Sequence, residues 1–109
     1  MIIHFNAIEE KVNPNFKGGK KAFNAKIAGD ALNKIIHGRL EKGASIGLHI
    51  HETNSEIIYI LQGTGTVLYD NTTETVTAGM CHYCPKGHSH SLMNNADEDL
   101  IFFAVIPEQ

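Results

Sequence analysis

The sequence predicts an all-β fold, an antiparallel sandwich or barrel. Short runs that are apolar or that alternate apolar and polar residues recur every 8 to 12 residues or so, with turn-forming residues between them. No segment has a convincing helical period, and there is no internal repeat. The chain has 109 residues, which is near the usual size of one domain and too short for two. We therefore expect a single domain over residues 1–109.

The N-terminal lead-in, residues 1–20, is the part that the pattern describes least well. Residues 1–5, MIIHF, are apolar enough to open a strand, but Asn13-Pro14-Asn15 and Gly18-Gly19 interrupt any regular structure. We expect this lead-in to wrap a sheet edge or to exchange a strand with a neighbouring subunit.

The remaining chain predicts a series of strands with a turn after each. The evidence for each strand is either period-two alternation or a β-branched apolar run, and the evidence for each turn is Gly, Pro, Asn or Asp. The expected strands are, in order, residues 23–28, 34–41, 45–51, 56–62, 66–70, 74–77, 80–84, 90–94 and 100–106. Residues 63–65 predict a hairpin turn. The last strand, LIFFAVI, is the most apolar and should be central or cover an interface.

Charge and composition exclude several classes of function. The net charge of −3 and the pI of about 6.1 provide no basic face for nucleic acid. No apolar run is long enough to cross a membrane, and the first residues do not resemble a secretion signal, so we expect a cytoplasmic protein. Cys81 and Cys84 are expected to be unpaired, because their positions within one strand do not favour a disulfide.

Four residues predict a metal site. His49 and His51 are separated by one residue, so on an extended strand both imidazoles lie on the same face. Glu56 follows a short polar bend and opens the next strand, and we expect a hairpin to place it across from the two histidines. His90 follows the Pro85–Gly87 turn at the start of another strand. Three imidazoles and one carboxylate are donors suited to a divalent transition metal.

The spacing of these residues resembles that of the cupin superfamily. Its first motif is matched by Gly43, His49, His51, Glu56 and Gly63, over residues 43–63. Its second motif, over residues 79–94, is matched in full as well, by Gly79, Pro85, Gly87, His90 and Asn94. The resemblance implies an antiparallel double-stranded β-helix, or jelly-roll barrel, with the metal inside. It does not imply a substrate, because one fold carries many functions.

The donor set constrains the metal only in part. The donors contain no thiolate, which argues against a structural zinc site built from cysteines. Fe, Mn, Ni, Zn, Co and Cu all remain candidates. Four protein ligands leave two positions of an octahedron open to small molecules. A divalent ion and one carboxylate leave a charge of about +1, so small anions are the expected ligands.

Three further residues are candidates for a substrate pocket. Arg39 is able to bind a carboxylate through two hydrogen bonds, but it also fits a solvent-facing strand. His88 shares strand parity with His90, or lies in a surface loop. His82 is either a pocket residue or an interior histidine bonded to a neighbour, at a position that is usually apolar in cupins. Cys84 is expected to fill apolar interior space.

Three functions are consistent with these observations. The first is a metal-dependent enzyme of oxygenase, isomerase or lyase type that acts on a small anionic or oxygen-rich metabolite. The second is a non-catalytic module that binds a sugar or a carboxylate at the metal. The third is a metal that only stabilises the barrel. We also expect a homodimer, because one small barrel leaves apolar strand faces to cover.

Overall fold

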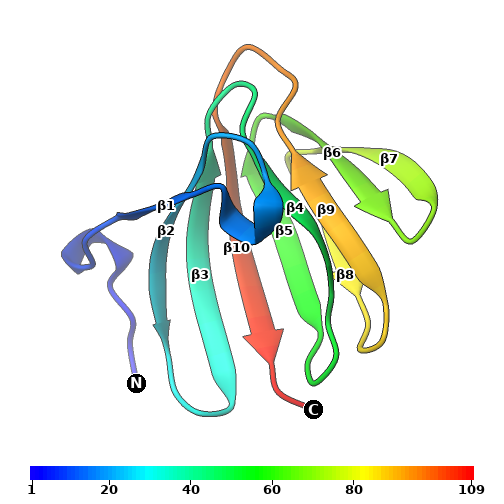
Figure 1. The fold of residues 1–109 in the computed structure, drawn as a ribbon. Helices are drawn as coiled ribbons and strands as arrows, with labels where there is room; N and C mark the ends of the chain where they lie inside the picture. Colours follow the sequence, from blue (N-terminus) through cyan, green and yellow to red (C-terminus); the bar gives the residue numbers. More distant parts are fainter.

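The computed structural model describes residues 1–109 and consists of strands with two short 3-10 segments, η1 (Phe5–Ala7) and η2 (Phe16–Gly18). The strands form two antiparallel sheets that face each other (Figure 1). In chain order they are β1 (Lys11–Pro14), β2 (Ala22–Gly29), β3 (Asn33–Leu40), β4 (Ser45–Ile50), β5 (Glu56–Gln62), β6 (Thr64–Tyr69), β7 (Thr72–Thr77), β8 (Cys81–Cys84), β9 (Ser89–Met93) and β10 (Leu100–Pro107).

One sheet has six strands in the order β1-β2-β3-β10-β5-β8, and the other has four in the order β4-β9-β6-β7. The apolar strand β10 lies between β3 and β5, so the prediction that it is central is confirmed. The two sheets and their connections form the predicted double-stranded β-helix of cupin type. None of the helical segments is long and apolar enough to span a membrane.

The core lies between the two sheets because alternate side chains of each strand point inward. On β10 the inward residues Leu100, Phe102 and Ala104 are fully buried. On β5 the same alternation buries Ile58 and Ile60, together with Glu56 at the start of the strand. The alternation along β5 therefore places the carboxylate of Glu56 in the interior.

The expected hairpin between His51 and Glu56 is wrong. β4 belongs to the four-stranded sheet and β5 to the six-stranded sheet, so the chain crosses between the sheets at residues 51–55. Glu56 consequently faces the two histidines from the opposite sheet. A local pattern cannot distinguish these arrangements, because a hairpin and a crossing can have loops of the same length.

The expected hairpin turn at residues 63–65 is also wrong, because β5 and β6 lie in different sheets. Gly63 forms this corner with φ of +92°, and a Cβ there would lie 2.5 Å from the carbonyl oxygen of Asp99. A glycine is needed at this corner for both reasons.

The structure of the lead-in, residues 1–20, differs from what the sequence pattern predicts. Residues 1–5 form no strand, whereas β1 includes Asn13 and Pro14, which were expected to interrupt structure. β1 is an edge strand that pairs with β2 of the same chain, and a proline is tolerated at the end of such a strand.

Candidate metal centre

The four predicted donors come from both sheets. His49 lies on β4, His51 directly follows that strand, and His90 lies on the neighbouring strand β9, opposite His49 in the register. Glu56 opens β5 on the facing sheet. The structure therefore brings together all four residues that the sequence selects.

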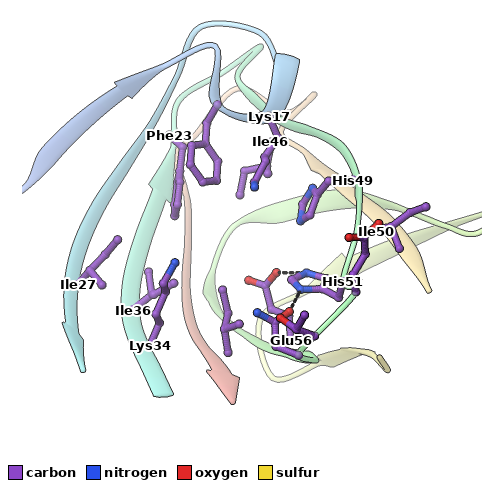
Figure 2. Close-up of a pocket in the computed structure, with 15 residues that line it drawn as sticks. Lys17, Phe23, Ile27, Lys34, Ile36, Ile46, His49, Ile50, His51 and Glu56 are labelled. Atoms are coloured by element: carbon purple, nitrogen blue, oxygen red, sulfur yellow. Dashed lines mark hydrogen bonds and ion pairs between the residues drawn. The ribbon is translucent and has the colours of Figure 1, made fainter. Parts of the chain in front are cut away.

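The donor atoms of these residues are close together. His90 Nε2 lies 2.9 Å from His51 Nε2, 3.2 Å from His49 Nε2 and 3.0 Å from Glu56 Oε1. His51 Nε2 lies 3.1 Å from the same carboxylate oxygen. His51, Glu56 and His90 are buried, and His49 is partly buried. Figure 2 shows His49, His51 and Glu56 around one side of a cavity.

The neighbours of His49 and His51 determine which ring nitrogen carries the proton. His49 Nδ1 lies 2.7 Å from the carbonyl oxygen of Gly47, which can only accept, so Nδ1 donates and Nε2 keeps its lone pair. His51 Nδ1 lies 2.6 Å from Asn54 Oδ1. The amide of Asn54 donates through Nδ2 to Glu108, which orients its oxygen toward His51. In both rings Nε2 therefore faces the cluster.

His90 completes this pattern through His82. His82 Nε2 lies 2.9 Å from His90 Nδ1, on the side of the ring away from the cluster. Burial lowers the pKa of His82 to about 4, with a further contribution from His90, so His82 is neutral. With an ion on His90 Nε2, the proton of His90 would lie on Nδ1 and His82 would accept it. All three Nε2 atoms and one carboxylate oxygen thus meet at one point, which is the arrangement of donors in a metal site whose outer hydrogen-bond partners are in place.

When no ion is bound, protons are shared among the four donor residues. Burial alone would raise the pKa of Glu56, but hydrogen bonds from His51 and His90 outweigh burial and lower it. The hydrogen bond to Glu56 raises the pKa of His51, against the effect of burial. Burial lowers the pKa of His49. A metal ion would have to displace protons from His51 in particular.

The donor geometry fits a transition metal. With metal–ligand bonds of about 2.1 Å, two donors at right angles are about 3.0 Å apart. The four close contacts between donor atoms, 2.9 to 3.2 Å, match that separation. His49, His51, Glu56 and His90 can therefore hold a metal ion, which would supply a Lewis-acid centre beside the cavity.

A cavity of about 310 Å³ opens beside the donors. Seven of its fifteen lining residues are isoleucine or phenylalanine, and they come from η2, β2, β3, β4 and β10. Its charged lining residues other than the donors are Lys17, Lys34 and Glu52. A pocket of this size is at the lower end of the range for small-molecule sites.

The profile of the Cupin domain family matches residues 36–106, which contain all four donors. The chain belongs to the cupin family. The resemblance seen in the two motifs is thereby confirmed.

This cupin is similar along its whole length to proteins of Thermotoga maritima. It is 34% identical over 115 residues to a protein named oxalate-binding protein, covering 97% of this chain and 93% of that protein. A crystal structure described as a predicted oxalate decarboxylase from the same organism matches with a TM-score of 0.94 and 30% identity, covering 100% of both chains. A structure described as a sugar phosphate isomerase from Silicibacter pomeroyi has a TM-score of 0.82 at 19% identity, with coverage of 100% and 76%, and shows the shared fold alone.

The structure does not bring the three candidate pocket residues of this cupin to the cavity. Arg39 forms ion pairs with Glu10, at 2.8 Å, and with Asp99, at 3.4 Å, outside the cavity lining. His88 is partly exposed and lies 2.8 Å from an Asp70 carboxylate oxygen. His82 lies behind His90 and contacts the donor cluster only through it.

Lys17 and Lys34 also line the cavity of this cupin, and neither was predicted from the sequence. Lys34 had a usable signal, because it shares strand parity with the buried Ile36 on β3. Lys17 had none, because its position depends on the conformation of η2 and on how η2 packs against β4. Cys84 is buried, and burial raises the pKa of its thiol to about 11.

Proposed function

We propose that this cupin holds a divalent transition metal ion through His49, His51, Glu56 and His90 and binds a small carboxylate at that ion. The observation that carries the proposal is the convergence of three Nε2 atoms and one carboxylate oxygen beside an accessible cavity. Four such atoms held this close together in a protein interior need shared protons or a cation between them.

The charge of the site favours an anionic ligand. Three neutral imidazoles and one carboxylate leave a divalent ion with a charge of about +1, and the apolar walls strengthen its attraction for an anion. The name of the Thermotoga maritima relative, oxalate-binding protein, supports a carboxylate as the ligand. Catalytic turnover of such a ligand, as an oxygenase, isomerase or lyase, is a further step that the experiment below also tests.

The test begins with metal content. Protein purified without an affinity tag, from its native host, should contain a single ion per chain by elemental analysis. Apoprotein titrated with Mn²⁺, Fe²⁺, Co²⁺, Ni²⁺, Cu²⁺ or Zn²⁺ should bind at the same site. Glu56→Gln should lower the metal affinity by at least about 100-fold, since even outer hydrogen-bond partners of a metal site account for 10- to 100-fold. The matched control is Glu98→Gln, because Glu98 is an exposed carboxylate outside the cavity.

Ligand binding and turnover are then separated on the metal-loaded protein. Calorimetric titration with oxalate should show binding that requires the ion. Oxygen uptake by the iron-loaded protein, and product analysis by NMR with small carboxylates and diketones, test for turnover. Binding without product would establish a binding module. An ion that raises stability while no carboxylate binds would contradict the proposal and leave a structural role for the metal.

We also propose that the protein is a homodimer formed through the outer face of the six-stranded sheet. Large apolar side chains are exposed on this face, on β5 and β8: Ile57 at 40%, Tyr59 at 43%, Leu61 at 46% and Tyr83 at 53%. The adjacent outward residues of β10 are also apolar. A contiguous apolar face of this kind is typical of an interface, and a two-fold axis would cover it on both copies at once.

We place the protein in the cytoplasm. Cys81 is exposed and Cys84 is buried, and neither is in a disulfide. An exposed free thiol is consistent with a reducing compartment. Localisation of a fluorescent fusion, compared with cell fractionation of the untagged protein, tests this placement.

A further inference from the structure

The cavity beside the donor cluster contains a second charged feature, the two lysines of its lining. Lys17 belongs to η2 and Lys34 to β3, so they reach the cavity from elements that are not neighbours in the chain. Figure 2 shows Lys17 at the top of the cavity and Lys34 on the side away from His49 and His51.

The backbone at Lys17 indicates that its position is imposed. Lys17 has φ of +55° and ψ of +29°, a left-handed conformation that is unfavourable for a residue with a side chain. Asn15 and Gly18 on either side have φ of +50° and +80°. Glycine would be the better residue at position 17 on backbone grounds alone. Unfavourable backbone that persists in a folded protein is concentrated at functional sites.

The packing of η2 against β4 holds this conformation in place. A Cβ at Gly47 would overlap the carbonyl oxygen of Lys17, so the two backbones lie as close as glycine allows. Ser45 Oγ accepts a hydrogen bond of 2.9 Å from the Lys20 amide, and the Ser45 amide donates at 2.9 Å to the Lys20 carbonyl. Because β4 also carries His49, the segment that positions Lys17 is attached to a strand of the donor cluster.

The cavity that contains the lysines and the donors also has apolar walls. Ile27 and Ile36 line the cavity beside Lys34 and Phe23 lines it nearer Lys17 (Figure 2), and no carboxylate pairs with either lysine. With a divalent ion, Glu56, Glu52 and the two lysines, the site has a net charge of about +2. The volume of about 310 Å³ exceeds what a two-carbon anion requires, since one water occupies roughly 30 Å³ of liquid.

We infer that this site is built for a dicarboxylate with a short apolar spacer, in which one carboxylate binds the metal and the other binds Lys17 and Lys34. This inference rests on the proposed function and extends it to the class of ligand. Oxalate would use only part of such a site, because both of its carboxylates reach the ion together. The apolar walls between the two charged regions would contact the spacer.

The test compares chain lengths and lysine variants on the metal-loaded protein. Calorimetry with oxalate, malonate, succinate, glutarate and butyrate gives affinities for wild type, Lys17→Met, Lys34→Met and Lys11→Met. Lys11 is an exposed lysine on β1, outside the cavity, and is the matched control. Elemental analysis confirms that each variant holds its ion, and circular dichroism confirms its fold.

Each lysine variant should lose about 10- to 100-fold in affinity for succinate or glutarate, the range expected for removal of a hydrogen bond between charged groups. Butyrate, which has one carboxylate, should bind each variant within about threefold of wild type, because a lone carboxylate stays at the ion.

Equal affinities of wild type and both variants for the longer dicarboxylates would overturn the inference while leaving carboxylate binding at the metal intact. Butyrate binding as tightly as succinate would overturn it as well. Failure of the metal-loaded wild type to bind any carboxylate would overturn both this inference and the proposed function.

Discussion

Each imidazole of the donor cluster has a dedicated hydrogen-bond partner behind it. The partners are a backbone carbonyl for His49, an amide oxygen for His51 and a second imidazole for His90. Such partners fix the tautomer and the ring orientation, and they make the metal-facing nitrogen a stronger donor. His82 is the member of this set that was expected only as a pocket residue or as an interior histidine.

Replacement of His82 tests its role behind His90. His82→Phe should lower metal affinity by about 10- to 100-fold, because His90 Nδ1 loses its acceptor. His82→Gln, whose side-chain oxygen can accept the same hydrogen bond, should restore most of that loss. Titration of apoprotein with a competing chelator provides the affinities, and His4→Phe, in the exposed lead-in, is the control.

A purely structural role for His82 makes a different prediction. In that case His82→Phe would change the free energy of unfolding of the apoprotein and leave the metal affinity of the folded fraction unchanged. Equal metal affinities of the Phe and Gln variants would contradict the positioning role.

At the level of elements, η2 and β4 act as one unit. The close approach at Gly47 and the hydrogen bonds of Ser45 with Lys20 attach an irregular segment to a regular strand. The irregular segment presents Lys17, and the strand presents His49. The attachment to the rigid strand β4 therefore fixes the position of Lys17, whose left-handed backbone conformation does not occur in a regular strand or helix.

Gly47→Ala tests the attachment. The added methyl group would overlap the Lys17 carbonyl oxygen, so η2 must move, and we expect the protein to lose about 1–3 kcal/mol in free energy of unfolding, as for other overpacked sites. The folded variant should still bind metal but bind succinate more weakly. Urea unfolding and calorimetry measure the two effects.

The control for this change is Thr75→Ala on the exposed strand β7, which should alter the unfolding free energy by less than about 0.5 kcal/mol. An alanine at position 47 that leaves both stability and succinate affinity unchanged would show that η2 is not held by this contact.

On the scale of the whole molecule, the donor cluster joins the two sheets. His49, His51 and His90 come from the four-stranded side, and Glu56 comes from the six-stranded sheet. An ion bound by all four would therefore link the two layers of the core, and its binding free energy would add to the stability of the fold.

Metal should raise thermal stability and acid should remove the effect. An ion at 100 times its Kd would add about 2.7 kcal/mol to the free energy of unfolding, which raises Tm by roughly 10 °C for a domain of this size. The hydrogen bond to Glu56 raises the pKa of His51, so His51 is an early site of protonation as pH falls. Because a protonated imidazole cannot bind metal, the increase in Tm should shrink from about pH 8 to about pH 5.

Calorimetric scans of the apoprotein and the metal-loaded protein across this pH range provide the measurement, with chelator added to the loaded sample as a reversal. In the apoprotein the raised pKa of His51 has the opposite sign: its contribution to stability is present at low pH and is lost as pH rises through the folded-state pKa. A metal-induced increase in Tm that is constant with pH would argue against imidazole ligands.

The proposed dimer is tested with Tyr59→Glu. Tyr59 lies within the apolar outer face and is 43% exposed, so a glutamate there would be tolerated by the monomer but would place like charges close together at a two-fold interface. Light scattering with size exclusion should show the mass falling to that of one chain. Thr75→Glu, on β7 of the other sheet, should leave the dimer intact, whereas an unchanged mass for Tyr59→Glu would place the interface elsewhere.

The sequence by itself determined the strands after the lead-in and the identity of the four donors. Strand alternation is a local property, so it placed His49 and His51 on one face and identified the apolar strand that became β10. The polar residues 52–55 separated the histidines from Glu56, and the Pro85–Gly87 turn marked the start of the strand that carries His90. The spacing of the two motifs was sufficient to indicate the family.

Only the tertiary structure decided which strands share a sheet and what surrounds the donors. The crossings at residues 51–55 and at Gly63 look like hairpins in the sequence, because loop length does not reveal whether the next strand pairs with the last one or packs against it from the facing sheet. Lys17 reaches the cavity through a left-handed turn that packs against Gly47, which is distant in the chain. His82 on β8 contacts His90 on β9, a strand of the other sheet. These contacts form between segments brought together by packing, and packing between sheets has no periodicity that a single segment could display.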